Sequence, residues 1–316
     1  MQPRIPFLPT PLRIGNWLRN RMSFYASVLL GKPVYRGLPY CASVEPVNFC
    51  NLHCPHCPTG RGNTGKTPHR LGWDDYRLLL ERLSPTLIHL NLFFQGEPTL
   101  HPLLPQMVAL AREKGVYTCV STNGQTLDRA MAQALADAGL NKLIIDLDGA
   151  DEESYQAYRQ GGSLQAACRA VREAVAAGLT VEVQCLLLAT TEHQKKAVRR
   201  LARSLGARHI TFKTAQLYDD RLAPSDGPDS RYRHTADGLV RKKPLRPRCA
   251  RLWRSVVVNT YGQVLPCCFD KQGQYVWGNL LQESLYQIVY SKAASGFRQA
   301  VMTRRASIPI CGNCCE

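Results

Sequence analysis

The chain has 316 residues, 45% of them apolar, with 13 cysteines and a formal net charge of +16. The apolar fraction suffices for a globular core, which excludes a disordered chain, and the clustered cysteines argue against a secreted disulfide scaffold. Clustered thiols suit iron–sulfur sites, so we expect a reducing, cytoplasmic location. The positive charge would attract nucleic acid, anionic lipid or an acidic substrate, and it identifies none of them.

The first predicted element is a basic helix spanning residues 11–32. Its longest apolar stretch, 24–30, is too short to cross a bilayer, and no convincing signal-peptide cleavage site is present. We therefore expect residues 1–40 to form an amphipathic extension. It either packs on the body of the protein or lies on a membrane surface. The apolar residues recur at roughly helical spacing, at Ile14, Trp17, Leu18, Met22, Tyr25, Val28 and Leu29.

Three cysteines follow the first predicted strand at the spacing C-x3-C-x2-C. They are Cys50, Cys54 and Cys57. Three thiolates on one loop can hold three corners of a [4Fe–4S] cluster, whereas an ordinary cluster takes four cysteines. The remaining iron would be an open coordination site, where metals do chemistry. Zinc ribbons usually pair C-x2-C, so the spacing favours iron; buried thiols or an irregular zinc loop are the alternative.

Alternating strand and helix patterns fill the middle of the chain. Six β/α units predict a parallel sheet with right-handed crossovers, either doubly wound or closed into a barrel, with the chemistry at the carboxyl ends of the strands. Four glycines, Gly115, Gly139, Gly178 and Gly206, stand where helix C-caps are expected. The predicted strands are 42–46, 87–94, 117–121, 142–147, 180–188 and 209–213, and the predicted helices are 73–83, 103–114, 128–138, 163–177 and 193–205.

The cysteine loop after the first strand resembles that of the radical S-adenosylmethionine (SAM) superfamily. The resemblance implies an open, partial (β/α)6 barrel over residues 41–216. It implies that the SAM amino and carboxylate groups bind the open iron, and that an electron donor such as flavodoxin or ferredoxin drives cleavage of SAM to a 5′-deoxyadenosyl radical. His56 stands where the family usually has an aromatic residue, and it could cover the adenine.

The second strand is followed by Gln-Gly-Glu-Pro at 95–98, which resembles the family's GGEP motif. The resemblance implies that Gly96 and Glu97 meet the SAM amino group. Taken alone, the same residues could be a strand-ending turn.

The ends of three further strands carry polar residues. The sequence STNG at 121–124 resembles the family's TNG turn and implicates Ser121 and Asn123 near the ribose and methionine of SAM. The sequence DLDG at 146–149 resembles its SLDG turn, with aspartate in place of serine, and implicates Asp148. Lys213 could meet a carboxylate of SAM or substrate, or be a solvated lysine.

Residues 217–248 are dominated by Asp, Pro, Gly, Ser, Arg and Lys, which predicts a linker or substrate loop. The region 249–316 has a predicted hairpin with arms at 256–259 and 264–266, two short helices at 285–290 and 296–303, and a second group of cysteines. Four of these can form a closed cluster site, or alternatively a zinc knuckle. They are Cys249, Cys267, Cys311 and Cys314.

This arrangement resembles the SPASM extension, which binds auxiliary [4Fe–4S] clusters in many radical SAM enzymes. Because the printed sequence has no further cysteine pattern after Cys311-Gly-Asn-Cys314, we expect one auxiliary cluster. Two neighbouring cysteines, Cys268 and Cys315, could replace Cys267 and Cys314 as ligands.

Together the resemblances imply an oxidoreductase that abstracts hydrogen from a substrate C–H bond. Asp270, three residues after Cys267, is a candidate base. We favour oxidative modification of a peptide or protein over a dehydrogenase or epimerase of a polar small molecule such as a sugar or cyclitol. RNA modification, or a zinc protein that binds nucleic acid without catalysis, is less favoured, because no aromatic–basic binding face is visible.

Overall fold

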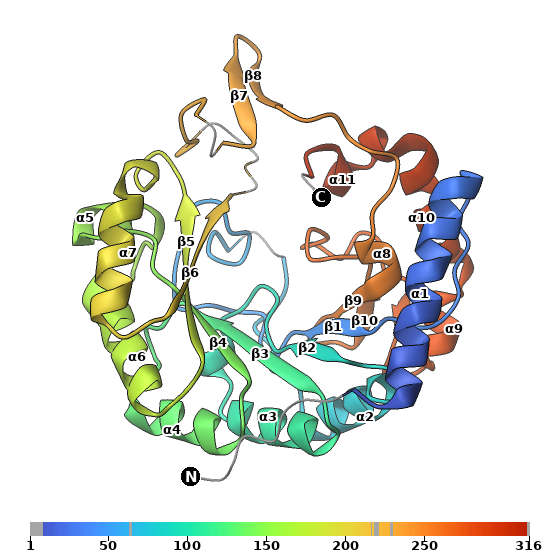
Figure 1. Ribbon diagram of the computed structural model, residues 1–316, viewed down its shortest axis with the longest axis horizontal. Coiled ribbons are helices and arrows are strands. Elements are labelled where there is room, and N and C mark those ends of the chain that lie inside the picture. Colours follow the sequence, from blue (N-terminus) through green and yellow to red (C-terminus); the bar gives the residue numbers. More distant parts are fainter. Residues whose placement is uncertain (1–8, 63–64, 216, 218–220, 228–229, 315–316) are drawn as a thin grey trace.

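The structure is a computed structural model that describes residues 9–62, 65–215, 217, 221–227 and 230–314. Its centre is a curved, nine-stranded sheet with helices on the outside (Figure 1). Six parallel strands lie side by side in chain order, which confirms the partial (β/α)6 barrel. They are β1 Cys41–Val44, β2 His89–Asn91, β3 Tyr117–Thr122, β4 Lys142–Asp146, β5 Val181–Leu187 and β6 His209–Thr214.

The helices between these strands agree closely with the expected ranges. They are α2 Trp73–Leu83, α3 Leu104–Glu113, α4 Arg129–Asp137, α6 Leu164–Ala176 and α7 Lys195–Ser204. The four predicted cap glycines all have positive φ, as a left-handed helix cap requires. One barrel helix, α5 Glu152–Tyr158, was not predicted. It begins where the Asp151 side chain accepts a hydrogen bond from the backbone N–H of Ser154.

The C-terminal region continues the barrel sheet, which the sequence pattern did not indicate. The predicted hairpin is present as β9 Ser255–Val258 and β10 Gln263–Leu265, and β9 pairs in parallel with β1. A short strand, β11 Gly278–Asn279, forms the edge. The helices of this region are α8 Arg251–Arg254, α9 Leu285–Val289, α10 Lys292–Arg304 and α11 Pro309–Gly312.

One hydrophobic core serves both regions. Ala42 and Val44 of β1 belong to the same buried cluster as Val256, Trp253 and Ile288 of the C-terminal region. Burial of this shared apolar surface fixes the C-terminal cysteines relative to the barrel.

The segment 217–248 contains a hairpin that was not predicted. Its strands, β7 Tyr232–Thr235 and β8 Gly238–Arg241, pair with each other and not with the large sheet. The hairpin projects beyond the carboxyl end of β5 (Figure 1). It therefore stands at the end of the barrel where the site is expected.

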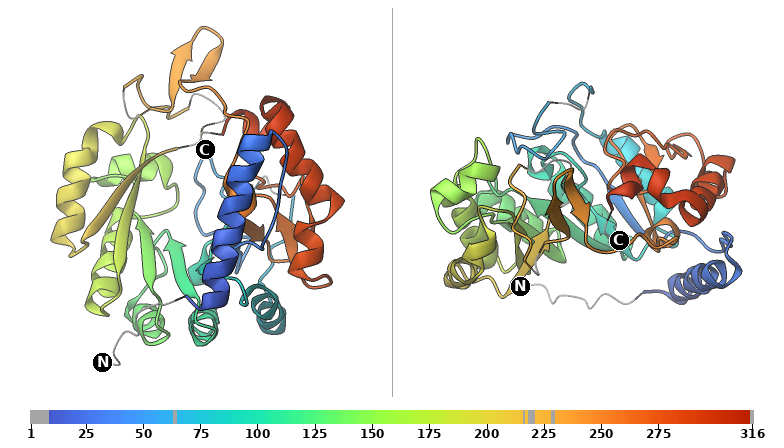
Figure 2. Two further views of the ribbon diagram at one scale, coloured as in Figure 1. Left: turned by 45° about the vertical axis from the view of Figure 1, so that its right-hand side comes forward. Right: turned by 90° about the horizontal axis from the view of Figure 1, so that it is seen from above.

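The predicted N-terminal helix is present as α1 Pro11–Leu30. The Thr10 side chain caps its first turn, and Gly31 ends it in a left-handed conformation. The helix runs along the outside of the molecule beside α8, at the end of the sheet opposite α7 (Figures 1 and 2). Within the described residues, no helix combines the length and apolarity needed to span a bilayer.

Candidate active site

The cysteine loop follows β1 and brings its three thiols together. Cys54 is buried, and Cys50 and Cys57 are half-buried. Backbone hydrogen bonds shape the loop, from Cys57 N–H to the carbonyl of Cys54 and from His53 N–H to that of Gln160. Burial is the main cause that raises the pKa of Cys50 to about 11 and that of Cys54 to about 12, and neighbouring thiols of the loop act in the same direction. A bound cation would reverse this preference and stabilise thiolates.

The donor set of the cysteine loop is the one that an iron–sulfur cluster takes. Across the part of the chain that the structure describes, no group of three or more His, Cys, Asp or Glu side chains is arranged to hold one metal ion. A [4Fe–4S] cube is larger than an ion, so its cysteines stand further apart. Three soft thiol donors on one loop provide the ligand set that such a cluster takes, with one iron left open.

The Gly96-Glu97 motif lies directly against the cysteine loop. A side chain at Gly96 would overlap the carbonyl of Val47, so only glycine fits there. The Glu97 N–H donates to the carbonyl of Phe49, one residue before Cys50. The motif therefore positions the loop as well as lying where SAM is expected.

The Glu97 carboxylate is buried and ties this motif to the end of β3. It accepts hydrogen bonds of 2.6 Å from the hydroxyls of Thr99 and Thr122, and one of 2.8 Å from the backbone N–H of Asn123. The turn at residues 95–98 and the turn at residues 121–124 thus form one hydrogen-bonded unit.

Asn123 links that unit to the cysteines. Its side-chain amide donates to the Oδ1 of Asn51 at 2.8 Å and contacts the Cys50 sulfur at 3.6 Å. Ser121 is half-buried two residues earlier on β3, opposite Ile144 of β4. The structure therefore places Asn123 against the cysteine loop and Ser121 within β3, and contact of either residue with SAM stays a prediction.

Asp148 is fully buried just after β4 and pairs with the guanidinium of Arg159, a residue that no sequence motif had marked. Its Oδ2 accepts from Nε of Arg159 at 2.6 Å, and its Oδ1 accepts from the backbone N–H of Leu186. Arg159 also forms a 3.0 Å ion pair with Asp146, and it lies 4.0 Å from the Cys54 sulfur. Arg159 follows the unpredicted helix α5, so no local pattern had marked it.

Burial raises the pKa of Asp146 above its usual range, and the cations of Arg159 and Lys213 oppose this shift. Lys213 is exposed on the edge strand β6, paired in register with Leu186. Its charge therefore acts on the carboxylate of Asp146 at the end of β4, and contact of Lys213 with SAM or substrate stays a prediction.

His56 is buried and connects the loop to the segment that carries the β7–β8 hairpin. Its Nε2 donates to the carbonyl of Arg221 at 2.6 Å, and its ring lies roughly parallel to Tyr158 with centroids 6.3 Å apart. Contact between His56 and adenine stays a prediction.

The four C-terminal cysteines converge from separate elements. Cys249 precedes α8, Cys267 follows β10, and Cys311 and Cys314 lie in and after α11. Burial raises the pKa of Cys311 to about 12, with further contributions from Cys249 and Cys314. Burial also raises the pKa of Cys267, with contributions from Cys268, Cys249 and Cys311. These mutual effects show that the four thiols lie near one another, and their binding of one cluster stays a prediction.

Cys268 has a different environment, since Nη1 of Arg251 contacts its sulfur at 3.5 Å. Cys315, the other alternative ligand, lies outside the described residues. The choice of Cys267 over Cys268 as a ligand therefore stays a prediction.

Asp270 is fully buried beside Cys267, but its carboxylate is already engaged. Its oxygens accept backbone hydrogen bonds from Gln274 and Tyr275 at 2.8 and 2.9 Å. This arrangement favours a role in fixing the loop over a role as base. The same loop meets the barrel, because Gln95 donates to the carbonyl of Lys271.

A second buried acid, Glu45, lies at this junction and was missed by the sequence analysis. It follows β1, and its Oε2 accepts from the backbone N–H of Thr260 in the turn of the β9–β10 hairpin at 3.3 Å. Burial raises the pKa of Glu45 to about 7. The sequence feature that could have identified Glu45 is an acidic residue directly after an apolar strand.

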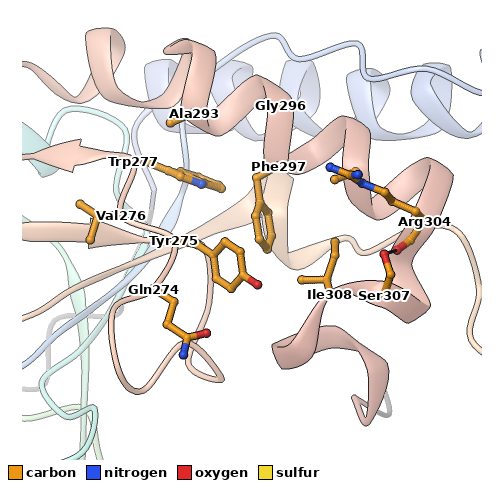
Figure 3. A pocket seen from close by; sticks show the side chains of 11 residues that line it. Gln274, Tyr275, Val276, Trp277, Ala293, Gly296, Phe297, Arg304, Ser307 and Ile308 are labelled. Carbon is orange, nitrogen blue, oxygen red and sulfur yellow. Dashed lines mark hydrogen bonds between the residues drawn. The ribbon is translucent and has the colours of Figure 1, made fainter.

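A separate pocket of about 550 Å³ lies between residues 274–277 and α10 (Figure 3). The aromatic rings of Tyr275, Trp277 and Phe297 line it, with Arg304 at one side. None of the predicted cluster or SAM ligands lines this pocket. The candidate active site is therefore identified by the residues at the strand ends and not by this pocket.

Two family models match the chain. The radical SAM superfamily matches residues 44–203, and the iron–sulfur cluster-binding SPASM domain matches residues 249–315. Mycofactocin maturase MftC of Mycobacterium ulcerans is 31% identical over 87% of this chain and 80% of its own length. PqqA peptide cyclase of Streptomyces rochei is 30% identical over 58% of the chain and 50% of its own length.

The relatives also include Fe-coproporphyrin III synthase of Methanosarcina barkeri, which is 33% identical over 42% of this chain and only 33% of its own length. Among solved structures, anSMEcpe with bound AdoMet and Cp18Cys peptide has a TM-score of 0.62 at 15% identity, covering 84% of this chain and 83% of its own. BtrN in complex with AdoMet and 2-DOIA has a TM-score of 0.56 at 20% identity, covering 88% and 94%.

The structural matches support the fold, and the sequence matches support the family. The chain therefore belongs to the radical SAM superfamily: it is an enzyme that uses SAM and [4Fe–4S] clusters and carries a SPASM domain at its C-terminal end.

Proposed function

We propose that the chain carries out an oxidative modification of a peptide or protein by radical SAM chemistry. When bound at the cysteine loop, a [4Fe–4S] cluster and SAM would supply a 5′-deoxyadenosyl radical. The main support for this proposal is that the cysteine loop lies against Asn123 and the Gly96-Glu97 motif at neighbouring strand ends. The loop carries Cys50, Cys54 and Cys57. Parallel sheets gather their chemistry at this end.

The residues around the loop would hold it in place. Glu97 ties the second and third strand ends together, and Arg159 joins the fourth strand end to the neighbourhood of Cys54. Buried, hydrogen-bonded neighbours of this kind orient metal ligands.

An oxidation removes a hydrogen atom from the substrate and then one electron and one proton. The hydrogen atom would leave in 5′-deoxyadenosine, the electron would pass to one auxiliary cluster held by Cys249, Cys267, Cys311 and Cys314, and the proton would pass to solvent water. The shared sheet of β9 and β1 fixes this second site relative to the barrel. A flavodoxin- or ferredoxin-like donor would reduce the first cluster, and we expect a reducing, cytoplasmic location for this chemistry.

Peptide or protein substrates are supported by two relatives, a maturase that matches 87% of this chain and a peptide cyclase that matches 58% of it. The hairpin β7–β8 projects beyond the barrel end and offers backbone edges that an extended peptide can pair with.

A polar small molecule is the second candidate, favoured by the inner face of the barrel. At the carboxyl end of β4, the Asp146 carboxylate accepts a hydrogen bond from the side-chain amide of Gln184 on β5. Such groups can bind hydroxyls of a sugar or cyclitol.

Deuterium transfer separates the two. The reduced enzyme is incubated with SAM and either a deuterated cell-peptide pool or deuterated sugars and cyclitols, and the mass of 5′-deoxyadenosine is measured. Deuterium from the peptide pool supports the proposal, whereas deuterium from the small molecules alone contradicts it. The Cys50/Cys54/Cys57→Ala variant is the control and should give no 5′-deoxyadenosine.

A further inference from the structure

Helix α1 packs on the protein with its polar face inward. Five polar side chains of the helix are buried: Arg13, Asn16, Asn20, Ser23 and Ser27. They recur every three or four residues, so they form one face of the helix. This arrangement is the reverse of an ordinary amphipathic surface helix, whose apolar face is the buried one.

The buried polar groups are bound to backbone groups of other elements. Arg13 donates to the carbonyls of Ser84, Lys114 and Gly115, where α2 and α3 end. Asn20 donates to the carbonyl of Trp253 at 2.6 Å, and Ser27 exchanges hydrogen bonds with Val34. Guanidinium groups are favourable at helix C-termini, so these contacts fix the rotation of α1 about its axis.

The apolar face of α1 is consequently exposed. Of the ten large apolar residues exposed within the described part of the chain, seven lie on this helix. Leu18, Met22, Tyr25 and Leu29 follow the spacing i, i+4, i+7, i+11 of a single stripe, and Leu29 is 86% exposed. The complete set is Leu12, Ile14, Leu18, Met22, Tyr25, Leu29 and Leu30. An exposed apolar stripe of this length marks an interaction surface.

The charge around the stripe selects the kind of partner. Residues 1–44 contain six basic residues and no acidic residue. Arg21 lies beside the stripe, over the rings of Trp17 and Tyr25, at 5.3 and 5.7 Å from their centroids. Arg19 and Lys32 are also exposed. A second copy of the chain would bring like charges together, whereas an anionic surface would bind both the apolar stripe and its basic flanks.

We propose that α1 lies flat on an anionic phospholipid surface. Leu18, Met22, Tyr25 and Leu29 would enter the boundary between headgroups and acyl chains, and the flanking arginines would bind lipid phosphates. Aromatic rings beside arginine suit this interfacial depth. The enzyme would then work at the membrane surface with its catalytic site held above it by the fixed rotation of α1.

Vesicle co-sedimentation tests this with the full chain. Vesicles of phosphatidylcholine containing phosphatidylglycerol are compared with pure phosphatidylcholine, for wild type and for the double variant Met22→Glu/Leu29→Glu. Both substituted side chains point into solvent, so the fold is expected to survive. The matched control is Val240→Glu, at an exposed apolar residue on β8.

We expect wild type and V240E to bind the anionic vesicles at least tenfold more tightly than the neutral ones. We expect M22E/L29E to lose at least tenfold in that binding while keeping SAM cleavage, which separates this proposal from the proposed catalytic function. Equal binding by M22E/L29E and wild type would overturn the proposal. The proposal would also be overturned if wild type bound no vesicles and instead formed a dimer in sedimentation velocity, and if the M22E/L29E variant were a monomer.

Discussion

The three cysteines of the barrel loop come from one short stretch, Cys50 to Cys57, whereas the four C-terminal cysteines are assembled from elements between Cys249 and Cys314. The first site depends on hydrogen bonds to neighbouring strand ends, through Glu97 and Asn123. The second depends on β9 pairing with β1 and on helices packed behind it. A compact motif can therefore be identified in a sequence, while an assembled site depends on the fold to select its ligands.

The sharpest test of this contrast is the choice between two adjacent thiols. Cys267→Ala should remove the iron of the auxiliary site, because Cys267 is the thiol grouped with Cys249 and Cys311. Cys268→Ala should keep it, because Cys268 contacts Arg251. Iron and acid-labile sulfide in the two purified variants measure this. Iron loss in C268A with retention in C267A would reverse the assignment.

Arg159 tests how strongly the barrel site depends on neighbouring strand ends. Arg159→Met should destabilise the protein by about 3–5 kcal/mol, because it leaves the buried carboxylates of Asp146 and Asp148 without their cation. Denaturant unfolding measures the change. Arg77→Met is the matched control: it breaks an exposed ion pair with Asp74, and we expect no measurable effect. Similar stability of both variants would contradict the assigned network.

Gly96 tests the contact between the second strand end and the cysteine loop. Gly96→Ala should displace the loop, because the added methyl overlaps the Val47 carbonyl. A displacement of this kind costs about 100-fold in rate. The readout is 5′-deoxyadenosine formation from SAM under reduction. Gly15→Ala on α1, where nothing lies within 4 Å, should leave that rate unchanged.

Glu45 tests the junction between the two regions. Because burial raises its pKa from 4.5 to about 7, folding favours the protonated form, so its contribution to stability is complete below pH 4.5 and is lost as the pH rises toward 7. The free energy of unfolding of Glu45→Gln, relative to that of wild type, should therefore rise by about 2 kcal/mol as the pH increases from about 4.5 to 6. Unfolding curves at several pH values measure this. The control Glu113→Gln, at an exposed residue, should show the same pH dependence of stability as wild type. If E45Q also showed that pH dependence, the assigned burial of Glu45 at the junction would be contradicted.

The sequence predicted the barrel well because each of its elements carries a local signal. Apolar periodicity gave the strands and helices, and the glycines after four helices all adopt the expected positive φ. The cysteine loop and the Gly96-Glu97 motif were identified for the same reason, since their spacing is local.

Features that depend on distant contacts were not predicted. Nothing in residues 255–258 indicates that they pair with β1, and nothing in residues 152–158 marked Arg159 as the partner of two aspartates. The rotation of α1 about its own axis, which decides which of its faces is buried, was also not predictable from the sequence. Its apolar spacing was correct, but the carbonyls that bind Arg13 come from the ends of α2 and α3 and turn the apolar face outward.

The most direct test of the account is the metal content of anaerobically reconstituted protein. Iron, acid-labile sulfide and 5′-deoxyadenosine formation are measured for wild type and for Cys50/Cys54/Cys57→Ala. We predict roughly eight irons in wild type, falling to about four in the variant with SAM cleavage abolished. Zinc in place of iron, or unchanged iron in the variant, would contradict a catalytic cluster at this loop.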